Sequence, residues 1–78
     1  MEPEQRKAIL QIVWESTSPL GWYGIGIRLG TRGIRLSKKL PTLLKELVKA
    51  GLLTHSQAEG HPHGVYSLTD LGHTQLKP

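Results

Sequence analysis

A stripe of apolar residues predicts a helix over about residues 3–16. The stripe consists of Ala8, Ile9, Ile12 and Val13. This spacing places side chains on one face of a helix. Leu10 and Trp14 form a second pair, four residues apart, beside the stripe. The pair either widens the core face or forms a self-association surface, which would make the protein a homodimer or part of a larger assembly.

A second, shorter helix is predicted over about residues 22–29. Tyr23, Ile25 and Leu29 are its expected inward residues. Its glycines do not form a phosphate-binding loop, because no strand precedes them and no Gly-Lys-Ser/Thr sequence follows. We expect instead that a missing side chain, at Gly26 above all, lets another helix approach closely.

The third predicted helix, about residues 37–50, has the clearest two-sided pattern. Ser37 is the expected N-cap and Gly51 the expected C′ residue, which leaves Pro41 in the first turn. At ~100° per residue, one arc of the helix is apolar. It contains Leu40, Leu43, Leu44 and Leu47. The opposite face carries Lys38, Thr42, Lys45 and Lys49.

The remainder predicts a two-stranded hairpin over about residues 52–68 and a short helix over about 69–76. Residues 52–57 and 64–68 are the strand candidates, separated by a turn-rich loop. Thr69, followed by an aspartate, is the expected cap of the last helix. Together the elements predict a single α+β domain spanning residues 1–78.

Composition narrows the class of protein. The chain has 78 residues, of which 37% are hydrophobic and 21% charged, so it is too apolar for a disordered tail. Without cysteine it has no disulfide, thiolate zinc site or thiol nucleophile. No apolar run reaches the length of a membrane span, and the acidic start does not resemble a signal peptide. We therefore expect a cytoplasmic protein.

Charge is distributed unevenly. The net charge is +4, and the stretch from Leu20 to Lys49 contains seven cations but a single acid, Glu46. The cations are Arg28, Arg32, Arg35, Lys38, Lys39, Lys45 and Lys49. A solvated face normally mixes both signs, whereas a one-sided basic field favours a polyanion, most commonly nucleic acid.

Four segments resemble the winged helix-turn-helix domain of PadR-like and MarR-like transcriptional regulators. They are residues 22–29, 36–40, 44–53 and 66–76, which match in order the second helix, the start of the recognition helix, its passage into the wing, and the segment after the wing. The resemblance implies a DNA-binding regulator associated with the nucleoid. Its third helix would enter the major groove of double-stranded DNA, with the hairpin beside the adjacent minor groove or backbone.

The expected DNA contacts follow from that docking. From the third helix they are Lys38, Lys39, Thr42 and Lys45. The expected phosphate contacts are Arg32, Arg35 and Lys49, and the expected contacts from the wing are His61 and His63. Because the third helix has no arginine, asparagine or glutamine, phosphate contacts should dominate over base readout.

Two other classes of function compete with this interpretation. A protein–protein interaction module would use Leu10, Trp14 and Trp22 as its exposed surface. An enzyme is not expected, since Asp70 and His73 are the nearest approach to a catalytic pair and no third group accompanies them. We predict no cofactor, and no metal at the His-x-His sequence of the hairpin loop, because no cysteine accompanies the two histidines.

Overall fold

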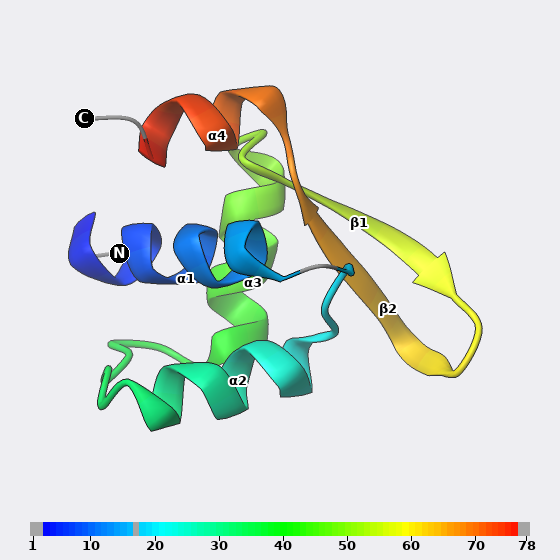
Figure 1. Cartoon of the computed structure of the whole chain (residues 1–78), viewed down its shortest axis with the longest axis horizontal. Helices are drawn as coiled ribbons and strands as arrows, with labels where there is room; N and C mark the ends of the chain where they lie inside the picture. Colours follow the sequence, from blue (N-terminus) through cyan, green and yellow to red (C-terminus); the bar gives the residue numbers. More distant parts are fainter. Residues whose placement is uncertain (1–2, 17, 77–78) are drawn as a thin grey trace.

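The computed structural model describes residues 3–16 and 18–76 (Figure 1). In chain order its elements are α1 (Pro3–Glu15), α2 (Trp22–Thr31), α3 (Leu40–Lys49), β1 (Leu53–Ala58), β2 (His61–Leu68) and α4 (Asp70–Leu76). The predicted order of helices and hairpin is confirmed, and the described residues form a small α+β structure. None of their helices is long and apolar enough to cross a lipid bilayer.

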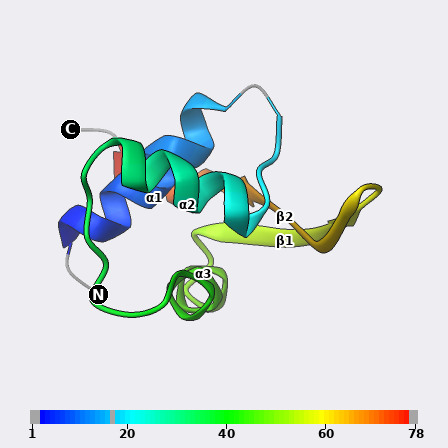
Figure 2. The same cartoon turned by 90° about the horizontal axis from the view of Figure 1, so that it is seen from below.

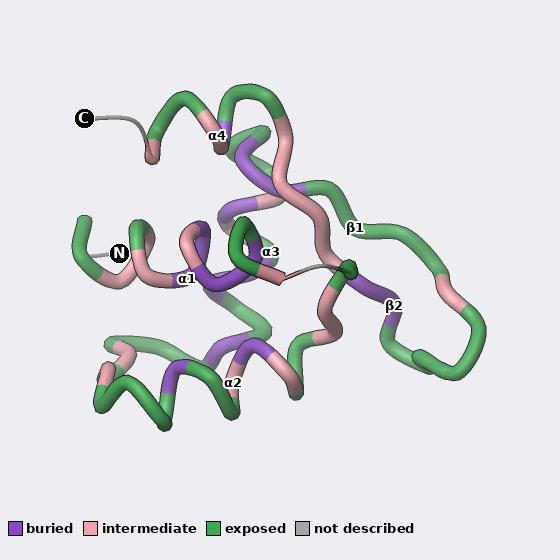
Figure 3. Tube along the Cα trace, viewed as in Figure 1, coloured by how far each residue is buried: buried purple, intermediate pink, exposed green. Residues whose placement is uncertain are grey.

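The core lies where α1, α2 and α3 meet and extends to the base of the hairpin (Figure 3). Its buried members are all aliphatic: Ile9, Leu10, Ile12, Val13, Ile25, Leu29, Leu40, Leu43, Leu44, Leu47, Leu52 and Leu53. Each such side chain contributes roughly 1.5–3 kcal/mol when it is fully removed from water. The four leucines predicted to face inward from α3 are among them.

Burial decides one open alternative, in favour of the wide core face for Leu10, and corrects one prediction, that for Tyr23. Leu10 is 0% exposed, because α1 is packed against α2, β2 and α4 and its apolar face is wide. It therefore cannot contribute to a self-association surface. Tyr23 is 68% exposed, since at ~100° per residue it lies more than a quarter turn away from the arc of Ile25 and Leu29.

The third helix begins later than predicted. Its N-cap is Lys39 rather than Ser37, and Pro41 lies at the start of the first turn. The ring of a helical proline clashes with the carbonyl four residues earlier, which here belongs to Ser37, so a helix starting there is disfavoured. Ser37 is held instead by α1: its N–H and Oγ both lie within hydrogen-bonding distance of Gln5 Oε1, at 3.3 and 3.2 Å.

Helix α3 ends as predicted, with a glycine at the C′ position. Gly51 has φ +81°, and its N–H donates to the Val48 carbonyl at 3.0 Å. The next N–H, that of Leu52, donates to the Leu47 carbonyl at 3.0 Å. This pair of bonds is the Schellman arrangement, which turns the chain sharply from α3 into β1.

The hairpin pairs β1 and β2 antiparallel, with Leu53 opposite Leu68 and His55 opposite Tyr66. Its base is fastened to the helices, because the Tyr66 N–H donates to the carbonyl of Leu20, ahead of α2, at 2.8 Å. Farther out the strands leave the body of the molecule, and the tip is exposed (Figure 3). The hairpin is thus anchored at its base, while its tip is exposed and the first residues of β2 lie beside the start of α2.

The last helix, α4, starts at the predicted cap. Thr69 Oγ1 accepts a hydrogen bond from the Gly72 N–H at 2.9 Å and donates one to the Gly51 carbonyl at 2.6 Å. Gly72 lies against the backbone of Leu52, where a Cβ atom would collide with the carbonyl oxygen. These contacts fix α4 to the turn between α3 and β1.

Candidate nucleic-acid interface

The outer face of α3 is open to solvent. Seen end-on in Figure 2, α3 lies at the edge of the molecule, with α1 and α2 on one side and the hairpin extending past it. Its leucines are buried, whereas Thr42, Lys45 and Lys49 are exposed. The predicted separation into an apolar inner side and a cationic outer side is confirmed for these residues.

Lys38 and Lys39 lie outside the helix. Because α3 starts at Leu40, the predicted alignment of Lys38 with the helical lysines is wrong. Lys38 Nζ is instead 3.0 Å from Glu46 Oε1, and this hydrogen bond lowers the pKa of the Glu46 carboxyl below its usual range. Lys38 therefore neutralises the acid on α3, while Lys39 is exposed at the N-cap and is not paired with any described residue.

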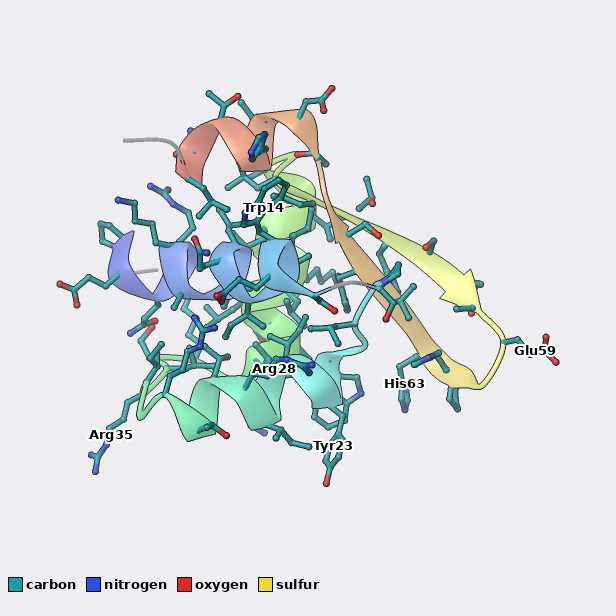
Figure 4. All side chains as sticks on the ribbon, in the orientation of Figure 1. Trp14, Tyr23, Arg28, Arg35, Glu59 and His63 are labelled. Carbon is teal, nitrogen blue, oxygen red and sulfur yellow. The ribbon has the colours of Figure 1, made fainter. Side chains whose placement is uncertain are left out.

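The two arginines after α2 differ in their surroundings. Arg32 forms an ion pair with Glu15 at the end of α1, and its hydrogen bond lowers the pKa of that carboxyl. Arg35 is exposed and points away from the body of the protein at the end opposite the hairpin (Figure 4). Among the described residues no acid pairs with Arg35, so it is the better placed of the two to meet a phosphate.

The wing histidines are both exposed, but they lie beside the start of α2. The rings of His63 and Trp22 meet edge to face, with centroids 6.3 Å apart. The ring of His61 lies near Gly21, where a Cβ atom would come within 3.5 Å of Nδ1. Among the described residues no three potential ligands are close enough together to hold a metal ion.

A further histidine, His55, lies on the side of the hairpin that faces α3. Its ring stacks on that of Tyr66, with centroids 4.7 Å apart and planes 13° from parallel. Its Nε2 donates to the His63 carbonyl at 2.7 Å, and this is possible because Gly64 has no side chain beneath the ring. Partial burial raises the pKa of the Tyr66 phenol.

This pair lines a hollow of about 270 Å³ between α3 and the hairpin. The other lining residues are Pro41, Lys45 and Val48. Sequence reasoning missed His55 and Tyr66 as site residues because each looks isolated in the chain. Only the strand register, which sets them opposite each other, brings them together beside Lys45.

The residues that the sequence suggested for self-association or catalysis make contacts within the protein. Trp14 is 53% exposed, and its ring stacks on His73 of α4 with centroids 4.3 Å apart. With Leu10 buried, the predicted self-association pair is reduced to this single tryptophan. His73, the base of the weak catalytic pair, thus packs against an aromatic ring.

No protein-family model, curated protein or solved structure matches the chain.

Proposed function

We propose that the protein is a winged-helix DNA-binding domain of a small transcriptional regulator. The outer face of α3 enters the major groove of double-stranded DNA, and the hairpin acts as the wing beside it. The observation that carries this proposal is the exposure of Thr42, Lys45 and Lys49 on a helix whose other side is buried leucine. The order of helices and hairpin is compatible with it.

Phosphate contacts supply most of the affinity in this proposal. Between Leu20 and Lys49, the exposed cations without an acidic partner among the described residues are Arg28, Arg35, Lys39, Lys45 and Lys49. The acid on α3, Glu46, is paired with Lys38, so the face offers an anion little repulsion. Each phosphate contact releases counterions, and each therefore adds about −0.9 to the slope of log affinity against log salt.

Base readout is weak by comparison. Thr42 is the one uncharged polar side chain on the outer face of α3, and its hydroxyl and methyl group suit a base edge or a thymine methyl. Lys45 adds a point charge beside the hollow that His55 and Tyr66 line. A protein of this kind binds duplex DNA with modest sequence preference and strong dependence on salt.

A salt series of duplex binding tests the proposal. Fluorescence anisotropy with a labelled duplex should give affinity that falls linearly on a double logarithmic plot, with a slope of about −3 for three to four phosphate contacts. A scrambled duplex of the same length should follow a similar line. An affinity independent of salt, or no binding at low salt, would contradict the proposal.

A further inference from the structure

The aromatic residues are distributed unusually. Burial of aromatic rings normally dominates a core, with 150–250 Å² removed from water for each ring. Here the core is entirely aliphatic, and the chain has no phenylalanine. All four tryptophan and tyrosine side chains lie at least partly at the surface: Trp14, Trp22, Tyr23 and Tyr66. These rings therefore make their contacts at the surface of the protein and do not fill its interior.

Two of the four rings stack face to face on a histidine ring, and two do not. Trp14 stacks on His73, and Tyr66 stacks on His55. The other two, Trp22 and Tyr23, belong to α2, and Tyr23 is the most exposed of the four rings at 68%. A stacking partner is thus present for the first pair of rings and missing for Tyr23 among the described residues.

Trp22, Tyr23 and His63 form a cluster that we call the aromatic shelf. Trp22 meets Tyr23 edge to face, with centroids 5.9 Å apart and planes 81° from parallel, and it meets His63 in the same manner. Tyr23 and His63 point toward the same side of the molecule, one from α2 and one from β2 (Figure 4). Edge-to-face packing on both sides of Trp22 holds the shelf together.

The shelf borders the proposed DNA interface. Gly26, one turn after Trp22, packs against Leu40 at the start of α3, where a Cβ atom would lie 3.3 Å from Leu40 Cδ2. His63 lies on the wing. Arg28, an exposed cation of α2 with no ion-pair partner among the described residues, lies beside Gly24, where a Cβ atom would come within 3.6 Å of its guanidinium. An exposed ring in a basic setting is complementary to a nucleic-acid base and its phosphates.

We propose that the aromatic shelf stacks on an unpaired base next to the duplex, with Tyr23 as the ring that the base covers. The preferred target is then a duplex with a single-stranded extension. Stacking is tolerant of base identity, because every base has a π face. This inference rests on the proposed DNA binding and extends it, since α3 alone offers little base readout.

The experiment compares three labelled DNAs by anisotropy at one salt concentration. They are a blunt duplex, the same duplex with a short single-stranded overhang, and the same duplex with an overhang of abasic nucleotides. The abasic overhang has the same phosphates without bases, so it isolates stacking from charge. The wild-type protein should prefer the normal overhang to the abasic overhang by about ten-fold, the effect of one stacked base.

Variants of α2 assign that preference to the ring. Tyr23→Ala should abolish the preference and leave affinity for the blunt duplex unchanged, whereas Tyr23→Phe should retain it. Ile27→Ala is the matched control, since Ile27 is 54% exposed and lies one turn after Tyr23. It should also retain the preference.

Three results overturn the inference in different ways. Equal affinity of the wild-type protein for the two overhangs overturns stacking but not duplex binding. A preference that survives in Tyr23→Ala overturns the role of the shelf in base stacking. Absence of binding to all three DNAs overturns the proposed function and this inference with it.

Discussion

Helices α1 and α3 are both amphipathic, but their surroundings differ. The first packs against α2, β2 and α4, while α3 makes its most extensive backbone contacts with α2 and β1 and keeps one open side (Figure 2). The polar positions of α1 mix both signs, including Glu4, Lys7 and Glu15. The open side of α3 has lysines, and its glutamate is neutralised by Lys38. A helix face that is merely solvated mixes signs, whereas the open face of α3 has the charge of a surface for an anion.

The largest expected effect tests how fully α1 is covered. Leu10→Ala should destabilise the protein by about 2–5 kcal/mol, because a buried leucine is replaced by a cavity. Ile27→Ala, at an exposed position of α2, should change stability by less than about 0.5 kcal/mol. Urea unfolding followed by circular dichroism measures both. Equal, small effects would contradict the coverage of α1 by α4 and the hairpin.

The next effect tests the attachment of α4, which closes the core on the side of α1. Gly72→Ala should cost roughly 1–3 kcal/mol, because the new Cβ atom collides with the Leu52 carbonyl. Gly30→Ala is the matched control, since nothing lies within 4 Å of its Cβ position in α2. That change should stabilise the protein by about 0.5–1 kcal/mol, and thermal unfolding of the two variants should move in opposite directions.

A smaller change in stability distinguishes Thr69, the cap of α4, from Ser37, which precedes α3. Thr69→Ala should cost about 1 kcal/mol, because the Gly72 N–H loses its acceptor. Ser37→Ala should cost less than about 0.5 kcal/mol, since Ser37 lies on the surface before α3 and does not cap it. Chemical denaturation is the measurement. A loss for Ser37→Ala as large as that for Thr69→Ala would contradict this difference between the two residues.

The smallest effect concerns the neutralised acid on α3. Lys38→Met should raise the pKa of Glu46 toward the ordinary glutamate range, because the hydrogen bond that lowers it is removed. A carboxyl whose pKa is lowered by folding stabilises the protein above its unfolded pKa, and that contribution is lost as pH falls through the folded pKa. The stability difference between wild type and variant should therefore vanish in acid. NMR titration of the Glu46 carboxyl checks the shift, and an unchanged pKa would exclude the pair in solution.

Short-range chemistry was predictable from the sequence. The spacing of the leucines on α3, the glycine stop at Gly51 and the cap at Thr69 each depend on a few neighbouring residues, and all three are confirmed. The start of α3 was also encoded locally, but by Pro41 rather than by Ser37. The clash between a proline ring and the carbonyl four residues earlier outweighs a good capping side chain.

Features that depend on tertiary packing were not predictable in this way. The burial of Leu10 requires knowing that α4 and β2 both return to α1. The stack of His55 on Tyr66 requires the strand register, and the ion pair between Lys38 and Glu46 requires the position of the turn before α3. Charge counts along the sequence located the basic region, but only the structure distinguishes the cations in ion pairs, Arg32 and Lys38, from the others.

The central claim is that the open face of α3 binds DNA through the position of its lysines and not through net charge alone. Lys45→Glu and Lys7→Glu change the net charge of the protein equally, and both positions are exposed. Measured by anisotropy against the same duplex at low salt, Lys45→Glu should lose about ten-fold or more in affinity, while Lys7→Glu on α1 should stay close to the wild-type protein. Equal losses in the two variants, with both still folded, would contradict the account.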